Sequence, residues 1–91
     1  MKSAYELAME RLEKQSPSAT LTDEQKREIA EIDSTFKARI AERELFLREQ
    51  ITKAKAAGEF DEVEKIEKQL GSEVRRLQAD SDEKKAKVRT R

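Results

Sequence analysis

The chain has 91 residues, a length that fits one small domain. It contains no cysteine and no histidine, which excludes disulfide frameworks, thiol nucleophiles, Cys/His zinc sites and imidazole general bases. Charged residues make up 44% of the chain, yet 20 Lys and Arg balance 20 Asp and Glu. Because net repulsion is absent, this composition favours long helices or a coiled coil over a disordered chain.

The first predicted element is a short helix over residues 3–15. Ser3 and Glu6 make a capping box at its start. Its apolar positions recur at helical spacing and are Tyr5, Ala8, Met9 and Leu12. Pro17 disfavours helix at the preceding residue, so residues 16–21 are expected to form a linker. An isolated helix of about a dozen residues is marginal in water, so we expect it to dock on its own hairpin or on a partner.

The second predicted element is a long helix over residues 22–57, which Thr22 and Gln25 begin with another capping box. Its apolar residues form one stripe on a helical wheel: Leu21, Ile29, Ile32, Phe36, Ile40, Leu47, Ile51 and Ala54. Several of them are spaced eleven residues apart. This period favours a nearly straight or slightly right-handed pairing over a strict left-handed heptad coil.

A turn is predicted at residues 58–60, followed by a second long helix over residues 61–88 and a basic tail at 89–91. The apolar stripe of this helix consists of Val63, Ile66, Leu70, Val74, Leu77 and, more weakly, Val88. Gly71 lies on the flank of the stripe. It either permits close approach of the other helix or is a tolerated surface glycine.

The two long helices are predicted to fold back on each other at Gly58, because glycine suits the left-handed conformation just after a helix. Each helix begins acidic and ends basic, which complements its own dipole. In an antiparallel pair, the acidic start of each helix lies beside the basic end of the other. The alternative is one kinked continuous helix, since a single glycine does not by itself end a helix.

The predicted fold is therefore all-α: a long antiparallel helical hairpin resembling a coiled coil, with a short N-terminal helix, associating into a four-helix homodimer. Leu45 falls opposite the main stripe and Phe46 on its shoulder, so one seam cannot bury both. They are expected to contact a second copy, to be covered by the first helix, or to form a partner site. The candidate self-association residues are Phe36, Ile40, Leu45, Phe46, Leu47 and Ile51.

The predicted tip of the hairpin is acidic, with Glu59, Asp61 and Glu62 as candidate partner-binding residues. Complementation of the helix dipole is the competing explanation. Residues 54–62 resemble the coiled-coil tip of the Gre transcript-cleavage factors, whose tip acids enter the secondary channel of RNA polymerase. The resemblance covers about nine residues and implies that these three carboxylates act at the tip. A chain of this length is not expected to include the globular domain that docks those factors.

The C-terminal end is rich in basic residues, and the candidates for a phosphate-binding surface are Lys84, Lys85, Lys87, Arg89 and Arg91. The net charge of zero and the absence of interleaved aromatic residues argue against nucleic acid as the partner. These basic residues are instead expected to complement the dipole and the acidic start of the preceding helix.

No catalytic motif is present, so the sequence predicts a protein that is not an enzyme and has no cofactor and no metal. No signal peptide or apolar run of membrane-spanning length is found, and the expected location is the cytoplasm. The predicted function is that of a structural or scaffolding module acting through helix–helix association. The alternative is a regulatory module that presents its acidic tip or basic tail to a larger machine, such as RNA polymerase or nucleic acid.

Overall fold

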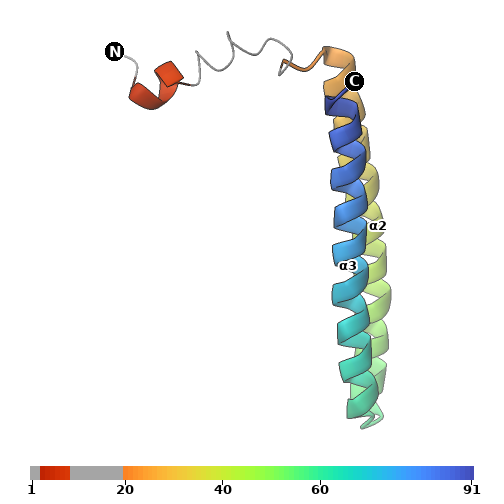
Figure 1. Cartoon of the computed structure of the whole chain (residues 1–91). Coiled ribbons are helices and arrows are strands. Elements are labelled where there is room, and N and C mark those ends of the chain that lie inside the picture. The colour runs from red at the N-terminus through yellow and green to blue at the C-terminus, as the bar shows by residue number, and fades with distance from the viewer. Residues whose placement is uncertain (1–2, 9–19) are drawn as a thin grey trace.

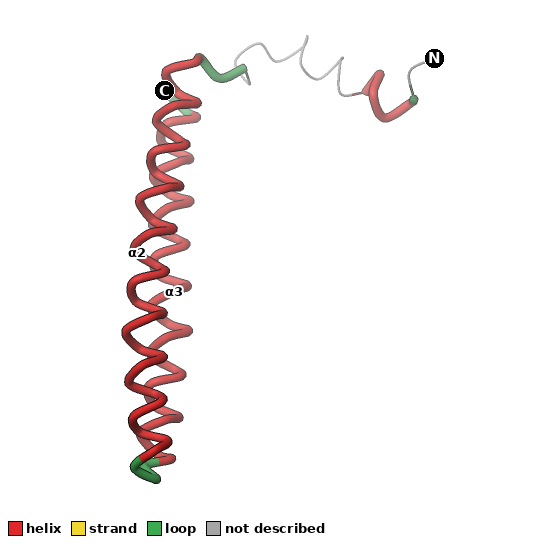
Figure 2. Tube along the Cα trace, turned by 180° about the vertical axis from the view of Figure 1, so that it is seen from behind, coloured by secondary structure: helices red, strands yellow, loops and turns green. Residues whose placement is uncertain are grey.

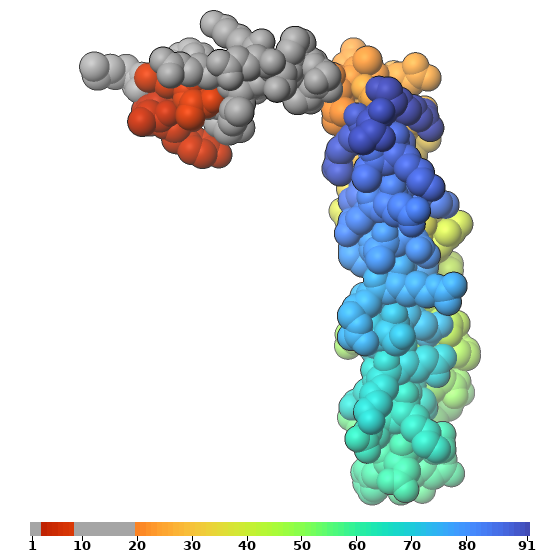
Figure 3. Space-filling model, in the orientation of Figure 1, coloured from red at the N-terminus to blue at the C-terminus, as the bar shows by residue number. Residues whose placement is uncertain are grey.

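The computed structural model of the protein describes residues 3–8 and 20–91. It contains two long helices, α2 (Asp23–Ala56) and α3 (Phe60–Arg89), and a helical turn at residues 4–8. The helices α2 and α3 run antiparallel and lie side by side along their length (Figures 1 and 2). Figure 3 shows α3 lying in front of α2 from the open end of the hairpin, where α2 begins and α3 ends, to the turn. The all-helical fold and the pairing of the two long helices are thus confirmed.

The helix bounds differ slightly from those predicted. Thr22 and Ala57, predicted as the ends of the first long helix, are its N-cap and C-cap, and the turn occupies residues 57–59. The helix α3 extends one residue further at each end than predicted, so Arg89 is helical rather than part of a tail. Residues 4–8 are helical as expected, whereas 9–19, which include the rest of the predicted short helix and most of the linker, lie outside the described residues.

The start of α2 is stabilised by the capping box that the sequence predicts. The Gln25 backbone N–H donates to Thr22 Oγ1 at 3.0 Å, and the Thr22 backbone N–H donates to Gln25 Oε1 at 2.8 Å. Two backbone donors that have no partner within the helix are therefore satisfied by side chains.

The chain reverses through a Schellman motif at Gly58. This glycine has φ +73°, in the left-handed region where an L side chain is strained. The N–H of Glu59 donates to the Ala54 carbonyl at 2.9 Å, and the N–H of Gly58 donates to the Lys55 carbonyl at 3.1 Å. These two bonds end α2 and direct the chain into α3, so the hairpin forms in place of the kinked continuous helix.

The seam between the arms is narrow and contains few buried residues. From α2 they are Phe36, Leu47 and Ala54, and from α3 they are Val63, Ser81 and Val88. Val88, which the sequence marks only weakly, is buried because α3 remains paired with α2 to its last turn. Ser81 is 2% exposed, although a serine does not signal a core position.

Gly71 does not mark a close approach of the two arms. A Cβ built at this position has Arg75 Nη1 as its nearest neighbour at 3.2 Å, and the three nearest atoms all belong to Arg75. The contacts therefore fit the alternative of a tolerated glycine within α3, beside a flexible side chain of the same helix.

Three ion pairs join the arms, and two of them confirm the predicted charge arrangement at the open end. Lys85 Nζ lies 2.7 Å from Asp33 Oδ1, and Arg91 Nη1 lies 2.7 Å from Glu28 Oε2. Arg43 Nη2 lies 3.0 Å from a Glu73 carboxylate oxygen nearer the middle. Near the turn, the part of the chain that the structure describes has no ion pair between the arms.

Within each helix, the sequence also predicts ion pairs between residues four apart: Asp33–Lys37, Glu44–Arg48, Glu49–Lys53, Asp61–Lys65 and Glu64–Lys68. These predicted pairs form only in part. Glu49–Lys53 and Glu64–Lys68 are present at 3.8 and 3.6 Å. Asp33 bonds Lys85 on the other arm rather than the predicted Lys37, because the cross-helix partner reaches it at shorter range. Two other predicted pairs are replaced or not formed in the described structure: Lys65 bonds Glu62 instead of Asp61, and Glu44 does not pair with Arg48.

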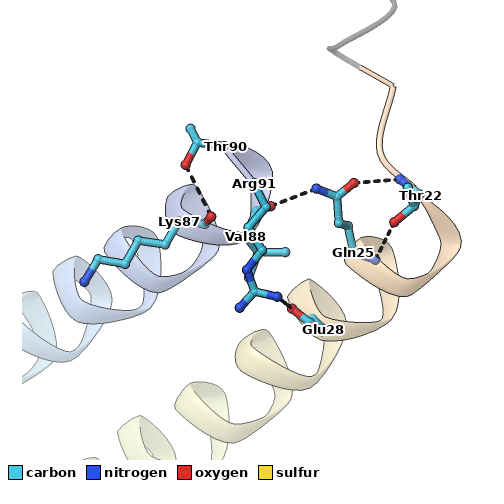
Figure 4. Close-up of polar contacts among 7 residues, drawn as sticks. All are labelled: Thr22, Gln25, Glu28, Lys87, Val88, Thr90 and Arg91. Atoms are coloured by element: carbon cyan, nitrogen blue, oxygen red, sulfur yellow. Dashed lines mark hydrogen bonds and ion pairs between the residues drawn. The ribbon is translucent and has the colours of Figure 1, made fainter.

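The side chain of Gln25 also forms a hydrogen bond between the start of α2 and the end of α3. Its Nε2 donates to the Val88 carbonyl at 2.9 Å while its Oε1 serves the capping box (Figure 4). We expect Gln25→Glu to keep the cap acceptor but to lose this donor, and to lower the free energy of unfolding by about 1–2 kcal/mol. Urea unfolding followed by circular dichroism measures the loss. Gln50→Glu, at a position near the turn, is the control, and an equal loss in both variants would contradict the assigned role.

Asp33 makes the hairpin sensitive to acid. The hydrogen bond from Lys85 and the charges of Lys85, Lys37 and Arg89 hold the pKa of the Asp33 carboxyl below its ordinary value of 3.8, against a smaller opposing effect of desolvation. A lowered folded-state pKa contributes stability that is present above pH 3.8 and is lost as the pH falls through the folded value. We expect Asp33→Asn to reduce the difference in unfolding free energy between neutral and acidic pH. The exposed Asp80→Asn is the control and should leave that difference unchanged.

Candidate functional site

The six predicted self-association residues lie at three different depths. Phe36 and Leu47 are buried in the seam, and Ile40 and Ile51 are half-buried beside it. Phe46 is 49% exposed and Leu45 is 73% exposed. The buried pair packs between the arms of the hairpin, so a second molecule would meet mainly the half-buried and exposed members.

Both arms carry apolar residues that the seam covers only in part. The half-buried residues are Ile29, Ile32, Ile40, Ile51, Ile66, Leu70, Val74 and Leu77. Two helices share a single seam, and each apolar stripe is wider than the strip that one neighbouring helix can cover. The hairpin therefore presents apolar flanks to its surroundings on both sides of the seam.

Phe46 and Leu45 are adjacent in sequence but face different directions. At about 100° per residue, Phe46 lies about 90° from the buried residues of α2, and Leu45 about 170° from them. The Arg43 guanidinium lies 5.1 Å from the centre of the Phe46 ring and bonds Glu73 on α3. The Arg43 Nε is buried and has no hydrogen-bond partner among the residues that the structure describes. Phe46 is thus held on one flank of the hairpin, beside a cross-helix ion pair, while Leu45 points away from both arms.

A groove of about 450 Å³ lies between the arms near the open end, on the flank that carries Phe46. We name it the open-end groove. Its lining includes Ile32, Phe36, Arg39, Lys84, Lys87 and Arg91, together with the carboxylates Glu28 and Glu31. Arg39 Cζ and Lys84 Nζ lie 5.1 and 5.3 Å from the centre of the Phe36 ring. The groove therefore combines an aromatic floor with cations from both helices, a pairing favoured by the negative face of the ring.

The tip of the hairpin combines carboxylates with an exposed aromatic ring. Glu59, Asp61 and Glu62 are all exposed, and Glu62 bonds Lys65 at 3.5 Å. Glu59 is the N-cap of α3 but its side chain makes no capping hydrogen bond. Phe60 is 69% exposed among these acids. Sequence reasoning placed it in the turn and did not weigh it, although an aromatic residue within an acidic turn was the available signal.

The five basic candidates near the C-terminus do not form one free patch. Lys85 bonds Asp33 and lies 3.7 Å from Asp82, and its side chain is only 14% exposed. The other contacts are Lys84 over the Phe36 ring, Lys87 with Glu83 at 3.4 Å, and Arg91 with Glu28. Arg89 is exposed on the last turn of α3. Most of these cations therefore bind acidic or aromatic groups of the hairpin itself. This fits the expectation that the basic end of α3 complements its own dipole and the acidic start of α2.

The described part of the first segment leaves Phe46 uncovered. Tyr5 and Leu7 are both exposed in the turn at residues 4–8. Met9 and Leu12, which were expected to contribute to such a cover, lie outside the described residues.

Within residues 3–8 and 20–91, no group of three or more acidic side chains is placed to hold a metal ion. None of the helices in these ranges combines the length and apolar character needed to cross a bilayer. Comparison of the chain with protein-family models, with curated proteins and with solved structures found no match.

Proposed function

We propose that this protein is a non-catalytic structural module that acts through helix–helix association, with two hairpins forming a four-helix homodimer. The observation that carries the proposal is the set of half-buried apolar residues on both flanks of the hairpin. Four-helix bundles cover such flanks by packing two helical hairpins around a shared core. Burial of a Val, Leu or Ile side chain contributes about 1.5–3 kcal/mol, so partial exposure on both arms favours self-association.

The mass and thermal stability of the protein as functions of concentration test this proposal. We expect sedimentation equilibrium to give twice the 10.5 kDa chain mass. We expect the melting temperature to rise between about 1 and 100 µM protein, because dimerisation stabilises the folded chain by mass action. A chain that remains at 10.5 kDa throughout this range, with a constant melting temperature, would contradict the proposal.

A second candidate is a regulatory module that presents its tip to a larger machine. The observation that favours it is the exposed Phe60 ring among Glu59, Asp61 and Glu62. An aromatic anchor with a charged surround is a common arrangement at protein interfaces. Reversal of the three acids to lysine should then abolish capture of RNA polymerase from a cell extract while helicity is preserved. Unchanged capture, or failure to capture with the natural chain, would argue against this candidate.

The basic end provides a separate test for nucleic acid as the partner. Binding through phosphate contacts weakens steeply as salt increases. An absence of any mobility shift with DNA or RNA at low salt would exclude this form of the second candidate.

A further inference from the structure

We infer that a second copy of this chain packs antiparallel against the flank that carries Phe46, so that Phe46 of each copy enters the open-end groove of the other. The inference rests on the proposed self-association, and it specifies the face, the orientation and the register. We name this flank the groove face, and it consists of Ile32, Phe46, Ile66, Leu77 and the open-end groove.

These residues share one side of the hairpin. On α2, Ile32 and Phe46 lie about 45° and 90° from the buried residues in the same rotational direction. The Arg43–Glu73 ion pair crosses to α3 on that side, and Ile66 and Leu77 lie within about 40° of Glu73 around α3. These four apolar residues and the open-end groove therefore form one continuous face that extends over both helices.

The groove face is more acidic at the turn than at its open end. At the open end, the four cations Arg39, Lys84, Lys87 and Arg91 are balanced by Glu28, Glu31, Asp80 and Glu83. Near the turn, a second groove on the same side has two carboxylates, Glu59 and Glu62, and one cation, Lys53. Two parallel copies would place the two acidic turn ends together. Two antiparallel copies place the acidic turn end of each beside the open-end cations of the other, so charge complementarity favours the antiparallel pair.

The helix rise sets the register of such a pair. At about 1.5 Å per residue, α2 extends about 52 Å from the turn, and Phe46 lies about 18 Å from the turn. In a fully overlapped antiparallel pair, Phe46 would face a point about 34 Å from the turn of the partner. Phe36 lies about 33 Å from that turn and forms the floor of the open-end groove.

The same register pairs other apolar residues of the groove face. Ile66 lies about 12 Å from the turn and would face Ile32 of the second copy, which lies about 39 Å from its own turn. Leu77 lies near the middle of α3 and would approach Leu77 of the second copy at the two-fold axis. An isologous dimer of this kind closes on itself, because each copy contributes one Phe46 and one groove.

The chemistry of the groove suits an aromatic side chain. Arg39 and Lys84 lie over the buried Phe36 ring, so the incoming Phe46 ring would meet these two cations rather than the ring beneath them. Contact of a cation with the negative face of the Phe46 ring is attractive. Leu45 points away from this face and should take no part.

Matched alanine variants test which face is used. We expect Phe46→Ala to raise the dimer dissociation constant at least about tenfold, as truncation of a central aromatic anchor does. Leu45→Ala, its more exposed neighbour, should change that constant less than about twofold. Circular dichroism of each variant verifies that the hairpin still forms. An equal effect of the two variants, or a dimer weakened only by Ile40→Ala on the opposite flank, would overturn the assignment of the face.

A charge exchange tests the orientation. In one variant the tip acids are reversed (Glu59→Lys with Glu62→Lys), and in the other the open-end cations are reversed (Lys87→Glu with Arg91→Glu). Each variant alone should associate more weakly than the natural chain at low salt. An equimolar mixture should form a heterodimer, because both contacts are then between opposite charges. A mixture that associates no better than its components would overturn the antiparallel arrangement.

Distances between spin labels on the two copies, measured by double electron–electron resonance, test the orientation of the pair directly. Each label can be attached to one introduced cysteine, because the chain has no cysteine of its own. Ala38 and Ala56 are exposed and lie five turns apart, on the same side of α2 and away from the groove face. Spin labels at Ala56→Cys should be about 46 Å or more apart between copies. Labels at the matched Ala38→Cys should lie at nearly the same level of the dimer, only about 8 Å apart along its long axis. The distance between them is then set mainly by the width of the four-helix bundle.

The possible outcomes separate the inference from the proposed function. Similar short distances from both labels indicate parallel hairpins and overturn the inference while leaving self-association intact. A long Ala56 distance together with a short Ala38 distance supports it. A chain that stays monomeric overturns both.

Discussion

Replacement of Phe36 by alanine is expected to lower the free energy of unfolding by about 3–5 kcal/mol, as for other buried aromatic residues. Phe36 is one of the few side chains that are buried in the seam of the hairpin. Its ring also lies beneath Arg39 and Lys84, which would lose that contact. Because small folded units retain few kcal/mol of net stability, such a loss is large enough to unfold the chain. Urea unfolding, or the loss of helical signal at 25 °C, measures the effect.

Phe60→Ala is the matched control for this variant. Its ring is exposed at the tip, and substitutions away from the core usually change stability by less than about 0.5 kcal/mol. Phe36→Leu, which retains most of the apolar volume, should recover a large part of the loss. Comparable destabilisation by Phe60→Ala and Phe36→Ala would contradict the burial seen in the structure.

The second large effect is expected from Ser81→Leu, a change that makes the apolar stripe of α3 more regular. Ser81 is buried in the seam and, by the register of the ion pairs, lies at about the level of Phe36 on the other arm. A larger side chain there must displace its neighbours, and overpacking typically costs about 1–3 kcal/mol. We therefore expect this apparently favourable substitution to lower the urea midpoint of unfolding.

Ser72→Leu on the exposed side of α3 controls for the change in helix propensity and surface hydrophobicity. Ser81→Ala controls for the loss of the hydroxyl without added volume. If Ser81→Leu instead raised the midpoint, the seam would have room for a larger side chain, and the tight packing at Ser81 would be refuted.

The hairpin was predictable because its determinants are local. The two capping signals, the glycine after α2 and the opposite charges at the ends of each helix all lie within a few residues of the features they control. The structure confirms the cap at Thr22, the reversal at Gly58 and the ion pairs of Glu28 and Asp33 with the far end of α3.

The depth of individual residues was less predictable because it depends on which strip of each helix faces the other. Ser81 is buried although nothing in the sequence marked it, and Val88 is buried although the sequence made it only a weak member of the stripe. The atoms nearest to a Cβ at Gly71 all belong to Arg75. The sequence placed Leu45 opposite the apolar stripe and Phe46 on its shoulder, and the fold adds that Phe46 lies beside the Arg43–Glu73 pair. A helical wheel gives a direction for each side chain, but it does not state how wide a strip the second helix will cover.

The sequence alone therefore determined that the chain forms two long helices that reverse at Gly58 with opposite charges side by side, since caps, turns and charge gradients act over short distances. The tertiary structure alone decided which apolar residues the seam buries and which remain on its flanks. It also decided that Ile32, Phe36, Arg39 and Lys84 meet in one groove. The physical reason is that a groove between two helices is made from residues about fifty positions apart, whose proximity depends on the register of packing.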